Sequence, residues 1–132
     1  MPEALVWARL RANAFRAKFK LGAADRAYLA DKGLAVVLAH AEAFVAQRLA
    51  PATPVKDGRQ TPWRGHPVFL AQHATATCCR SCLATWHGIP KGRTLEAAER
   101  ARVVALIERW LREQSEAPPA MAGRQGDLWA DL

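Results

Sequence analysis

Apolar residues between Gly33 and Pro51 recur every three or four positions, the spacing that places side chains on one face of an α-helix. This pattern constrains the fold most, because a helix of this length must bury its apolar face against other elements. Similar spacing predicts helices over residues 3–20, from residue 78 to about residue 86, and from Thr94 onward. The central stripe consists of Leu34, Val37, Leu38, Ala41, Val45 and Leu49.

Only residues 67–72, PVFLAQ, are typical of a β-strand, and one short strand cannot form a sheet without partners. Residues 51–67 are dense in Pro, Gly and other turn-forming residues, which predicts a loop. We therefore expect a mainly α protein, a small single-domain helical bundle with one long loop and at most a short strand.

The helical pattern ends near residue 114, and the stretch EAPPAMAGRQ that follows is rich in Pro, Gly and small side chains. We expect residues 1–114 to form one domain and residues 115–132 to form a flexible tail. No apolar run is long enough to span a bilayer, and the start of the chain lacks an apolar signal segment. Three cysteines within five positions make a poor disulfide framework, so we expect a cytoplasmic protein.

All three cysteines and two of the four histidines lie within HATATCCRSCLATWH, residues 73–87. Soft and borderline ligands at this spacing suit tetrahedral zinc. The expected zinc ligands are His73, Cys79, Cys82 and His87, with His66 and Cys78 as alternates. The match to a zinc knuckle is incomplete, because Gly92 stands where that module has its last cysteine. An iron–sulfur cluster and buried, inert thiols on one helix face are the alternatives.

The same cluster is compatible with catalysis. Zinc deaminases combine H-x-E with a later C-x-x-C, and His40 and Glu42 precede Cys79 and Cys82 in that order. The lack of a proline before Cys79 and of predicted strands argues against a deaminase. A neighbouring histidine would also activate Cys78 or Cys79 as a nucleophile. An enzyme acting on nucleic acid, of nuclease, deaminase or glycosylase type, and a redox or metal-sensing module are therefore alternative functions.

The chain carries a net charge of +7, and residues 51–93 contribute six basic residues and one acidic residue. This concentration favours a phosphate-bearing partner, although a solvated basic face has the same composition. The stretch KGRT, residues 91–94, brings two cations to a predicted helix N-terminus, where backbone amides favour an anion. Trp63 would stack on an unpaired base or anchor its loop. The expected nucleic-acid-binding residues are Lys56, Arg59, Trp63, Arg64, Lys91 and Arg93.

The tail contains QGDLW, residues 125–129, which resembles the pentapeptide that binds the bacterial sliding clamp. Leu128 and Trp129 would fill an apolar pocket of the clamp, and Gln125 would set the register through hydrogen bonds. A segment that folds back and buries Leu128 and Trp129 on its own domain is the alternative.

The central block resembles a family of small bacterial proteins named domain of unknown function 4186. The resemblance rests on DGRQTPWRGHPVFLAQHATATCCRSCLATWHGIPKGR, residues 57–93, with weaker support from FRAKFKL, DRAYLADKG and HAEAF. It covers most of residues 9–112, excludes the tail and brings no activity with it. We expect a small accessory protein of bacterial DNA replication or repair, which binds nucleic acid near a zinc site and is recruited to the sliding clamp.

Overall fold

The computed structural model describes residues 2–116, which form helices and loops and contain no strand. The helices are α1 (Glu3–Ala12), α2 (Ala14–Ala17), α3 (Ala23–Lys32), α4 (Leu34–Phe44), α5 (Pro67–Ala74), α6 (Arg80–His87) and α7 (Ala97–Glu116). A π-helical turn, η1 (Val45–Leu49), continues α4. The prediction of a small, mainly α, single-domain fold is confirmed.

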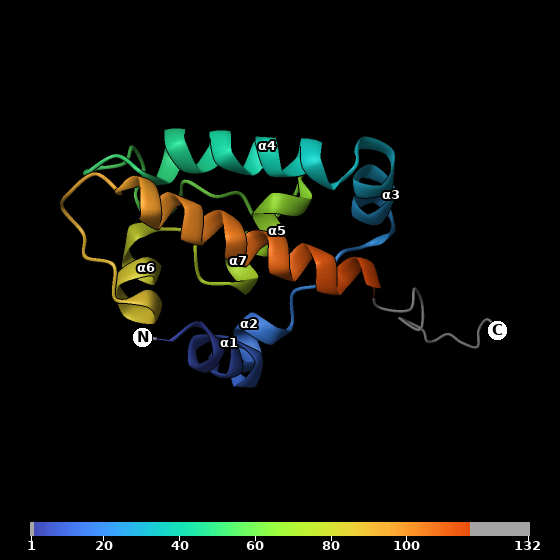
Figure 1. Ribbon diagram of the computed structural model, residues 1–132, viewed down its shortest axis with the longest axis horizontal. Helices are drawn as coiled ribbons and strands as arrows, with labels where there is room; N and C mark the ends of the chain where they lie inside the picture. Colours follow the sequence, from blue (N-terminus) through green and yellow to red (C-terminus); the bar gives the residue numbers. More distant parts are fainter. Residues whose placement is uncertain (1, 117–132) are drawn as a thin grey trace.

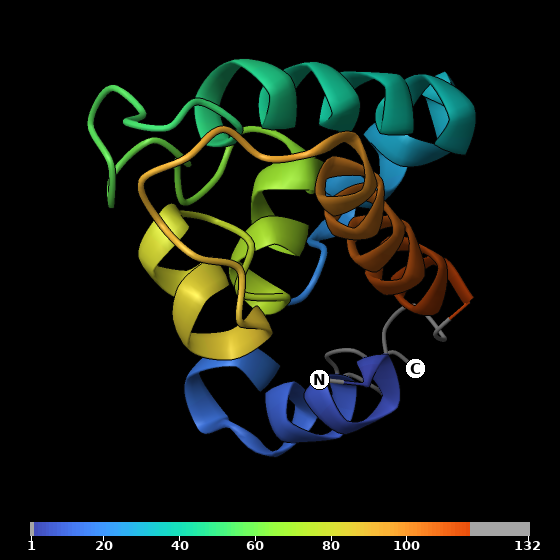
Figure 2. The same cartoon turned by 60° about the vertical axis from the view of Figure 1, so that its left-hand side comes forward.

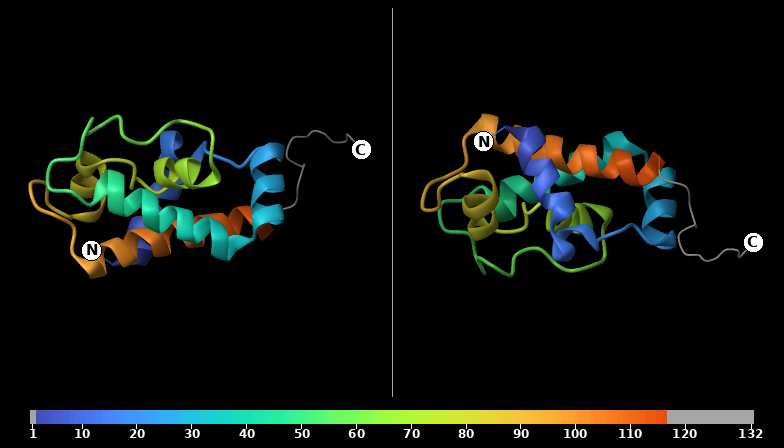
Figure 3. Two further views of the ribbon diagram at one scale, coloured as in Figure 1. Left: turned by 90° about the horizontal axis from the view of Figure 1, so that it is seen from above. Right: turned by 90° about the horizontal axis from the view of Figure 1, so that it is seen from below.

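Helices α4 and α7 form the framework of the molecule (Figure 1). Helix α5 packs against both of them, and α3 packs against α4 and α5 at one end. The view from below shows α1 and α2 lying across the underside of this layer (Figure 3). Helix α6 lies directly against these N-terminal helices (Figure 2). The segment that carries the cysteines is therefore placed where the N-terminal helices meet the rest of the domain.

The long apolar stripes are buried as helical spacing predicts. In α4 and η1 the fully buried members are Val37, Ala41, Val45 and Leu49, while Leu34 and Leu38 pack at the edge of the core. The stripe of α7 consists of Val103, Leu106, Ile107, Trp110 and Leu111.

Two residues interrupt the helices of the N-terminal half. Gly33 separates α3 from α4, with a φ of 86° that favours glycine. The prediction of one helix over residues 3–20 is wrong, because the backbone of Asn13 is extended and α2 begins after it. The Asn13 side chain accepts the Arg16 N–H at 3.0 Å, so it caps α2 instead of continuing α1.

Residues 67–72, expected as the one short strand, belong to helix α5. Pro67 occupies the first turn of this helix, where its missing N–H costs nothing and its fixed φ suits the helix. The ring of His66 caps the same turn by accepting the Val68 N–H at 3.1 Å. A six-residue apolar run does not by itself distinguish a strand from a buried helix, and these two end signals decide for the helix.

The ends of the last two helices also differ from expectation. Helix α6 begins at Arg80 rather than at residue 78, and its N-cap is Cys79. Helix α7 begins at Ala97, three residues after the predicted start at Thr94.

Helix α7 continues to Glu116, two residues beyond the predicted domain boundary. The clamp-binding prediction falls on Gln125, Leu128 and Trp129, which lie outside the described residues. Across residues 2–116, no helix combines the length and the apolar character needed to cross a membrane.

Candidate metal centre

Three sulfur atoms converge at the turn between α5 and α6. The Sγ atoms of Cys78, Cys79 and Cys82 all lie within 4.8 Å of one another. Cys78 and Cys79 precede α6, and Cys82 lies in its first turn. The Cys79 Sγ accepts the Cys82 N–H at 3.4 Å, so the cap of the helix holds one sulfur next to another. This group of three thiols can hold a metal ion.

The spacing of the sulfurs fits a tetrahedral thiolate site. A zinc ion with Zn–S bonds of about 2.3 Å places its sulfur ligands about 3.8 Å apart. The Cys78 and Cys82 sulfurs are 3.7 Å apart. Thiolates are also the ligands that soft and borderline metal ions prefer.

The guanidinium of Arg16 lies against this sulfur group. It donates to the Cys82 Sγ at 3.2 Å, to the Cys78 Sγ at 3.8 Å and to the backbone oxygen of His73 at 2.8 Å. Hydrogen bonds from Cys78 and Cys79, followed by Arg16, lower the pKa of the Cys82 thiol well below its usual range. Hydrogen bonding to Cys79 and Cys82, together with burial, raises the pKa of the Cys78 thiol. Without a metal the group therefore favours one thiolate at Cys82, stabilised by two thiols and one cation.

His73 borders the sulfur group but does not belong to it in the described part of the chain. Its ring is buried, and Nε2 donates to the backbone oxygens of Thr61 at 3.3 Å and Pro62 at 3.1 Å. Burial is the main cause that lowers its pKa. One face of the ring stacks on Trp63, with ring centres 4.1 Å apart and planes 10° apart. The contacts assigned to His73 are thus backbone and aromatic ones.

His87 also lies apart from the three sulfurs in the described residues. It is buried at the end of α6, and its Nε2 donates to the backbone oxygen of Thr75 at 2.8 Å. Its Nδ1 is buried and has no hydrogen-bond partner within residues 2–116. Burial is the largest cause that lowers its pKa, so the ring favours the neutral form.

His66 and His40 form a hydrogen-bonded pair at the start of α5. The His66 Nδ1 accepts a backbone N–H as the cap of α5, so its Nε2 carries the hydrogen and donates to the His40 Nδ1 at 3.0 Å. Burial and the neighbouring His40 lower the pKa of His66 to about 4. The deaminase alternative required His40 beside Cys79 and Cys82, and the structure pairs it with His66 instead.

An aromatic surface adjoins the sulfur group. Trp63 is 59% exposed and Phe15 is 41% exposed, and their rings meet edge to face. Phe19 lies parallel to Trp63, and Lys18 lies over both phenylalanine rings. Residues 4–24 and 58–95, which supply this surface and the cysteines, contain no Asp or Glu. The two segments that supply the exposed rings therefore carry positive charges and no negative ones.

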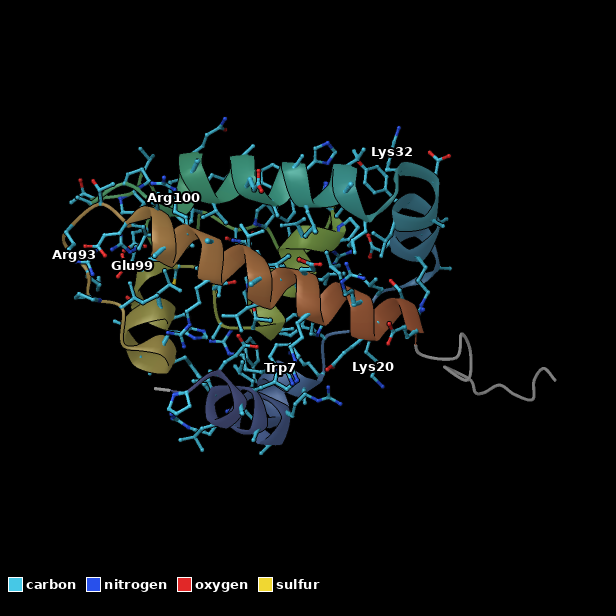
Figure 4. The ribbon with its side chains drawn as sticks, in the orientation of Figure 1. Trp7, Lys20, Lys32, Arg93, Glu99 and Arg100 are labelled. Atoms are coloured by element: carbon cyan, nitrogen blue, oxygen red, sulfur yellow. The ribbon has the colours of Figure 1, made fainter. Side chains whose placement is uncertain are left out.

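The remaining predicted nucleic-acid contacts fall into two groups. Lys56, Arg59 and Arg64 lie exposed on the loop before α5. Arg93 donates twice to the carboxylate of Glu99, at 2.7 Å each, as Figure 4 shows beside the start of α7. Lys91 lies 3.9 Å from the Asp57 carboxylate.

The helix N-terminus expected to bind an anion already faces a carboxylate. The Glu99 Oε1 accepts the Glu96 N–H at 2.9 Å, which is the reciprocal part of a capping arrangement. The hydrogen bond from Arg93, and then the one from Glu96, lower the pKa of Glu99 to about 2. Arg93 and the α7 N-terminus therefore already have hydrogen-bond partners within the chain. The rings of Trp63 and Phe15, by contrast, are exposed.

Two arginines central to the site escaped sequence reasoning. Nothing in the sequence links Arg16 to cysteines more than 60 residues away. Arg80 is 1% exposed and donates to the backbone oxygens of Leu49, Ala50, Pro51, Pro90 and Arg93. Helical spacing from Leu83 and His87 would have placed Arg80 on the buried face of α6.

The family model described as Domain of unknown function (DUF4186) matches residues 4–112, and the chain belongs to this family. No solved structure matches the chain.

Proposed function

We propose that this member of the DUF4186 family binds one zinc ion through Cys78, Cys79 and Cys82 and associates with nucleic acid beside that ion, while its tail recruits it to the bacterial sliding clamp. The observation that carries the proposal is the convergence of three sulfurs within 4.8 Å. The three parts rest on different residues and are tested separately.

The charge of the site supports a bound divalent ion. Three thiolates and one zinc ion carry a net charge of −1, which the Arg16 guanidinium at 3.2 Å from the Cys82 Sγ offsets. Three protein ligands leave one tetrahedral position for water or a substrate atom, as in catalytic zinc sites. His73 and His87 keep their Nε2 hydrogen bonds to the backbone in this arrangement.

Zinc content of the purified chain tests the metal site. The protein, prepared under reducing conditions without chelator, should contain one equivalent of zinc. Cys78→Ser, Cys79→Ser and Cys82→Ser should each lower the zinc content, whereas His87→Gln and the neighbouring exposed control Ser81→Ala should keep it. Circular dichroism shows whether each variant is folded. Less than about a tenth of an equivalent in the folded wild type, or full zinc in all three serine variants, would refute the site.

The aromatic surface supports binding of a single strand. Unpaired bases stack on exposed aromatic rings, and cations along the path contact the phosphates. Trp63 and Phe15 supply the rings. Lys18 lies over the Phe15 ring, and Arg64 follows Trp63 in the sequence. Duplex DNA would leave these rings without stacking partners.

Binding of a fluorescent oligonucleotide tests this part. Trp63→Ala should weaken single-strand binding about tenfold or more, because one stacked base contributes about 1–3 kcal/mol. The matched control is Val36→Ala, which removes an exposed apolar side chain from α4. Affinity should fall as salt rises. Equal affinities of the Trp63→Ala variant and the wild type would show that the surface does not bind the strand.

The clamp part rests on residues 125–129 and is tested on the purified clamp. Replacing Leu128 and Trp129 by alanine should abolish binding without lowering the melting temperature. A lowered melting temperature with unchanged clamp binding would favour a tail that folds back on its own domain.

A thiol redox switch is a second candidate, favoured by the 3.7 Å between the Cys78 and Cys82 sulfurs. Peroxide would convert the Cys82 thiolate to a sulfenic acid and release hydroxide, and the Cys78 thiol would then form the disulfide and release water. Mass spectrometry of metal-free protein after peroxide treatment should show loss of two hydrogens. Cys78→Ser should stop at the sulfenic acid, and unchanged thiols in the wild type would exclude the switch.

A further inference from the structure

We propose that a cavity between the N-terminal helices and α7 binds a small organic anion of about the size of a nucleoside monophosphate. This site is separate from the sulfur group and does not require a bound metal. It shares one residue with that group, Arg16.

The cavity has a volume of about 280 Å³, and its apolar lining includes Trp7, Leu10 and Trp110. Its polar lining consists of Arg11, Arg16, Lys20 and Gln114. Figure 4 shows Trp7 and Lys20 on the side of α7 that faces α1 and α2. The cavity thus combines an aromatic wall with cationic groups.

The charge of the lining selects the sign of the ligand. Among the residues of 2–116 that line the cavity, three are cations and none is a carboxylate. Arg11 is partly compensated, because it donates to the exposed Glu113 carboxylate at 2.6 Å. Arg16 is part-buried, and Lys20 has no acidic residue within its own sequence segment, residues 4–24. A phosphate or carboxylate in this half-enclosed space would gain charge-assisted hydrogen bonds.

Arg16 has donors left for such a ligand. A guanidinium has five N–H groups. The contacts of Arg16 with the His73 oxygen and the two sulfurs use three of them. The cysteines themselves do not line the cavity. A bound anion would therefore lie one side chain away from the sulfur group and would share its cation.

Size and shape restrict the ligand class. Small-molecule sites have volumes of about 300–1,000 Å³, and this cavity, at about 280 Å³, lies just below that range, which favours a small ligand. A flat ring would pack against the aromatic side chains that line the cavity, and an anionic head would pair with the cations. A mononucleotide or a small aromatic carboxylate has this combination, whereas a longer strand would have to follow the exposed aromatic surface instead.

Calorimetric titration of the full chain tests the site, with AMP, inorganic phosphate and benzoate as ligands. AMP should bind saturably and more tightly than phosphate if the aromatic wall contributes, and benzoate tests the carboxylate source. Lys20→Ala should weaken AMP binding about tenfold, the effect of one charged hydrogen bond. The matched control is Lys32→Ala, an exposed lysine of α3 that does not line the cavity.

A filled cavity provides a second variant. Ala17 lines the cavity and is exposed, so Ala17→Phe should block it without disturbing the core. AMP binding should be lost in this variant while the melting temperature stays near that of the wild type. Absence of saturable binding by all three ligands would overturn the proposal. AMP affinities of Lys20→Ala and Ala17→Phe equal to that of the wild type would also overturn it. Binding of oligonucleotides without binding of AMP would do the same.

Discussion

Replacing Arg80 by methionine should cost about 3–5 kcal/mol of unfolding free energy. Its guanidinium donates at 2.8, 2.9 and 2.8 Å to the backbone oxygens of Pro51, Pro90 and Arg93. Three short hydrogen bonds from a charged donor contribute about 1.5 kcal/mol each, which gives about 4–5 kcal/mol before the removal of a buried charge offsets part of the loss. The Ala50 oxygen keeps the Leu95 N–H as a partner at 2.9 Å.

Equilibrium unfolding in urea, at a fixed zinc concentration, measures this cost as a shift of the midpoint at constant slope. Arg80→Lys should give an intermediate value, because an ammonium group cannot reach both groups of carbonyls at once. The matched control is Arg112→Met, since Arg112 is 57% exposed and pairs with Glu108 one turn away. Its loss should stay below about 0.5 kcal/mol. A loss below about 1 kcal/mol for Arg80→Met would refute the reasoning that Arg80 joins the loop at Pro51 to the loop at Pro90 and Arg93.

Three further predictions concern pH and backbone conformation. The pKa of Glu99 is lowered to about 2, mainly by Arg93, so its stabilisation is present above pH 4.5 and is lost as the pH falls toward 2. Glu99→Gln should be less acid-sensitive in that window, as measured by the melting temperature. The pKa of His66 is lowered to about 4 by burial and His40, so stability should fall as the pH drops from 6.5 to 4. His66→Asn, which keeps a capping side chain, should fall less in urea unfolding across that range. Gly88 ends α6 with a φ of 70°, and Gly88→Ala should cost about 1 kcal/mol in thermal unfolding.

Helical spacing predicted the parts of the fold that depend on long stripes and failed where one side chain sets an end. The stripes of α4 and α7 are repeated over enough turns that burial decides the structure. The break at Asn13 depends on a single capping hydrogen bond, and the start of α5 depends on Pro67 and the His66 ring. Such local signals are weak in a sequence because the same residues also occur in loops.

The sequence located the candidate site, but it could not identify the residues that meet there. The cluster of cysteines is compact in sequence, so their proximity required no knowledge of the fold. The approach of Arg16 and the stacking of Trp63 on His73 depend on packing between distant segments. Pairing of Arg93 with Glu99 crosses the start of α7, which was expected three residues earlier.

Helix geometry explains why the three sulfurs group without His87. Cys82 and His87 are five residues apart, and five residues of α-helix rotate a side chain by about 140°. A shared metal ion required the helix to end before His87, but α6 includes His87 as its last residue and Gly88 is its C-cap. Cys79, by contrast, has extended backbone as the N-cap, and its sulfur turns back over the first turn to meet Cys82. The grouping of the sulfurs therefore follows from where α6 begins, and on the proposed zinc site His87→Gln should retain zinc while Cys78→Ser should not.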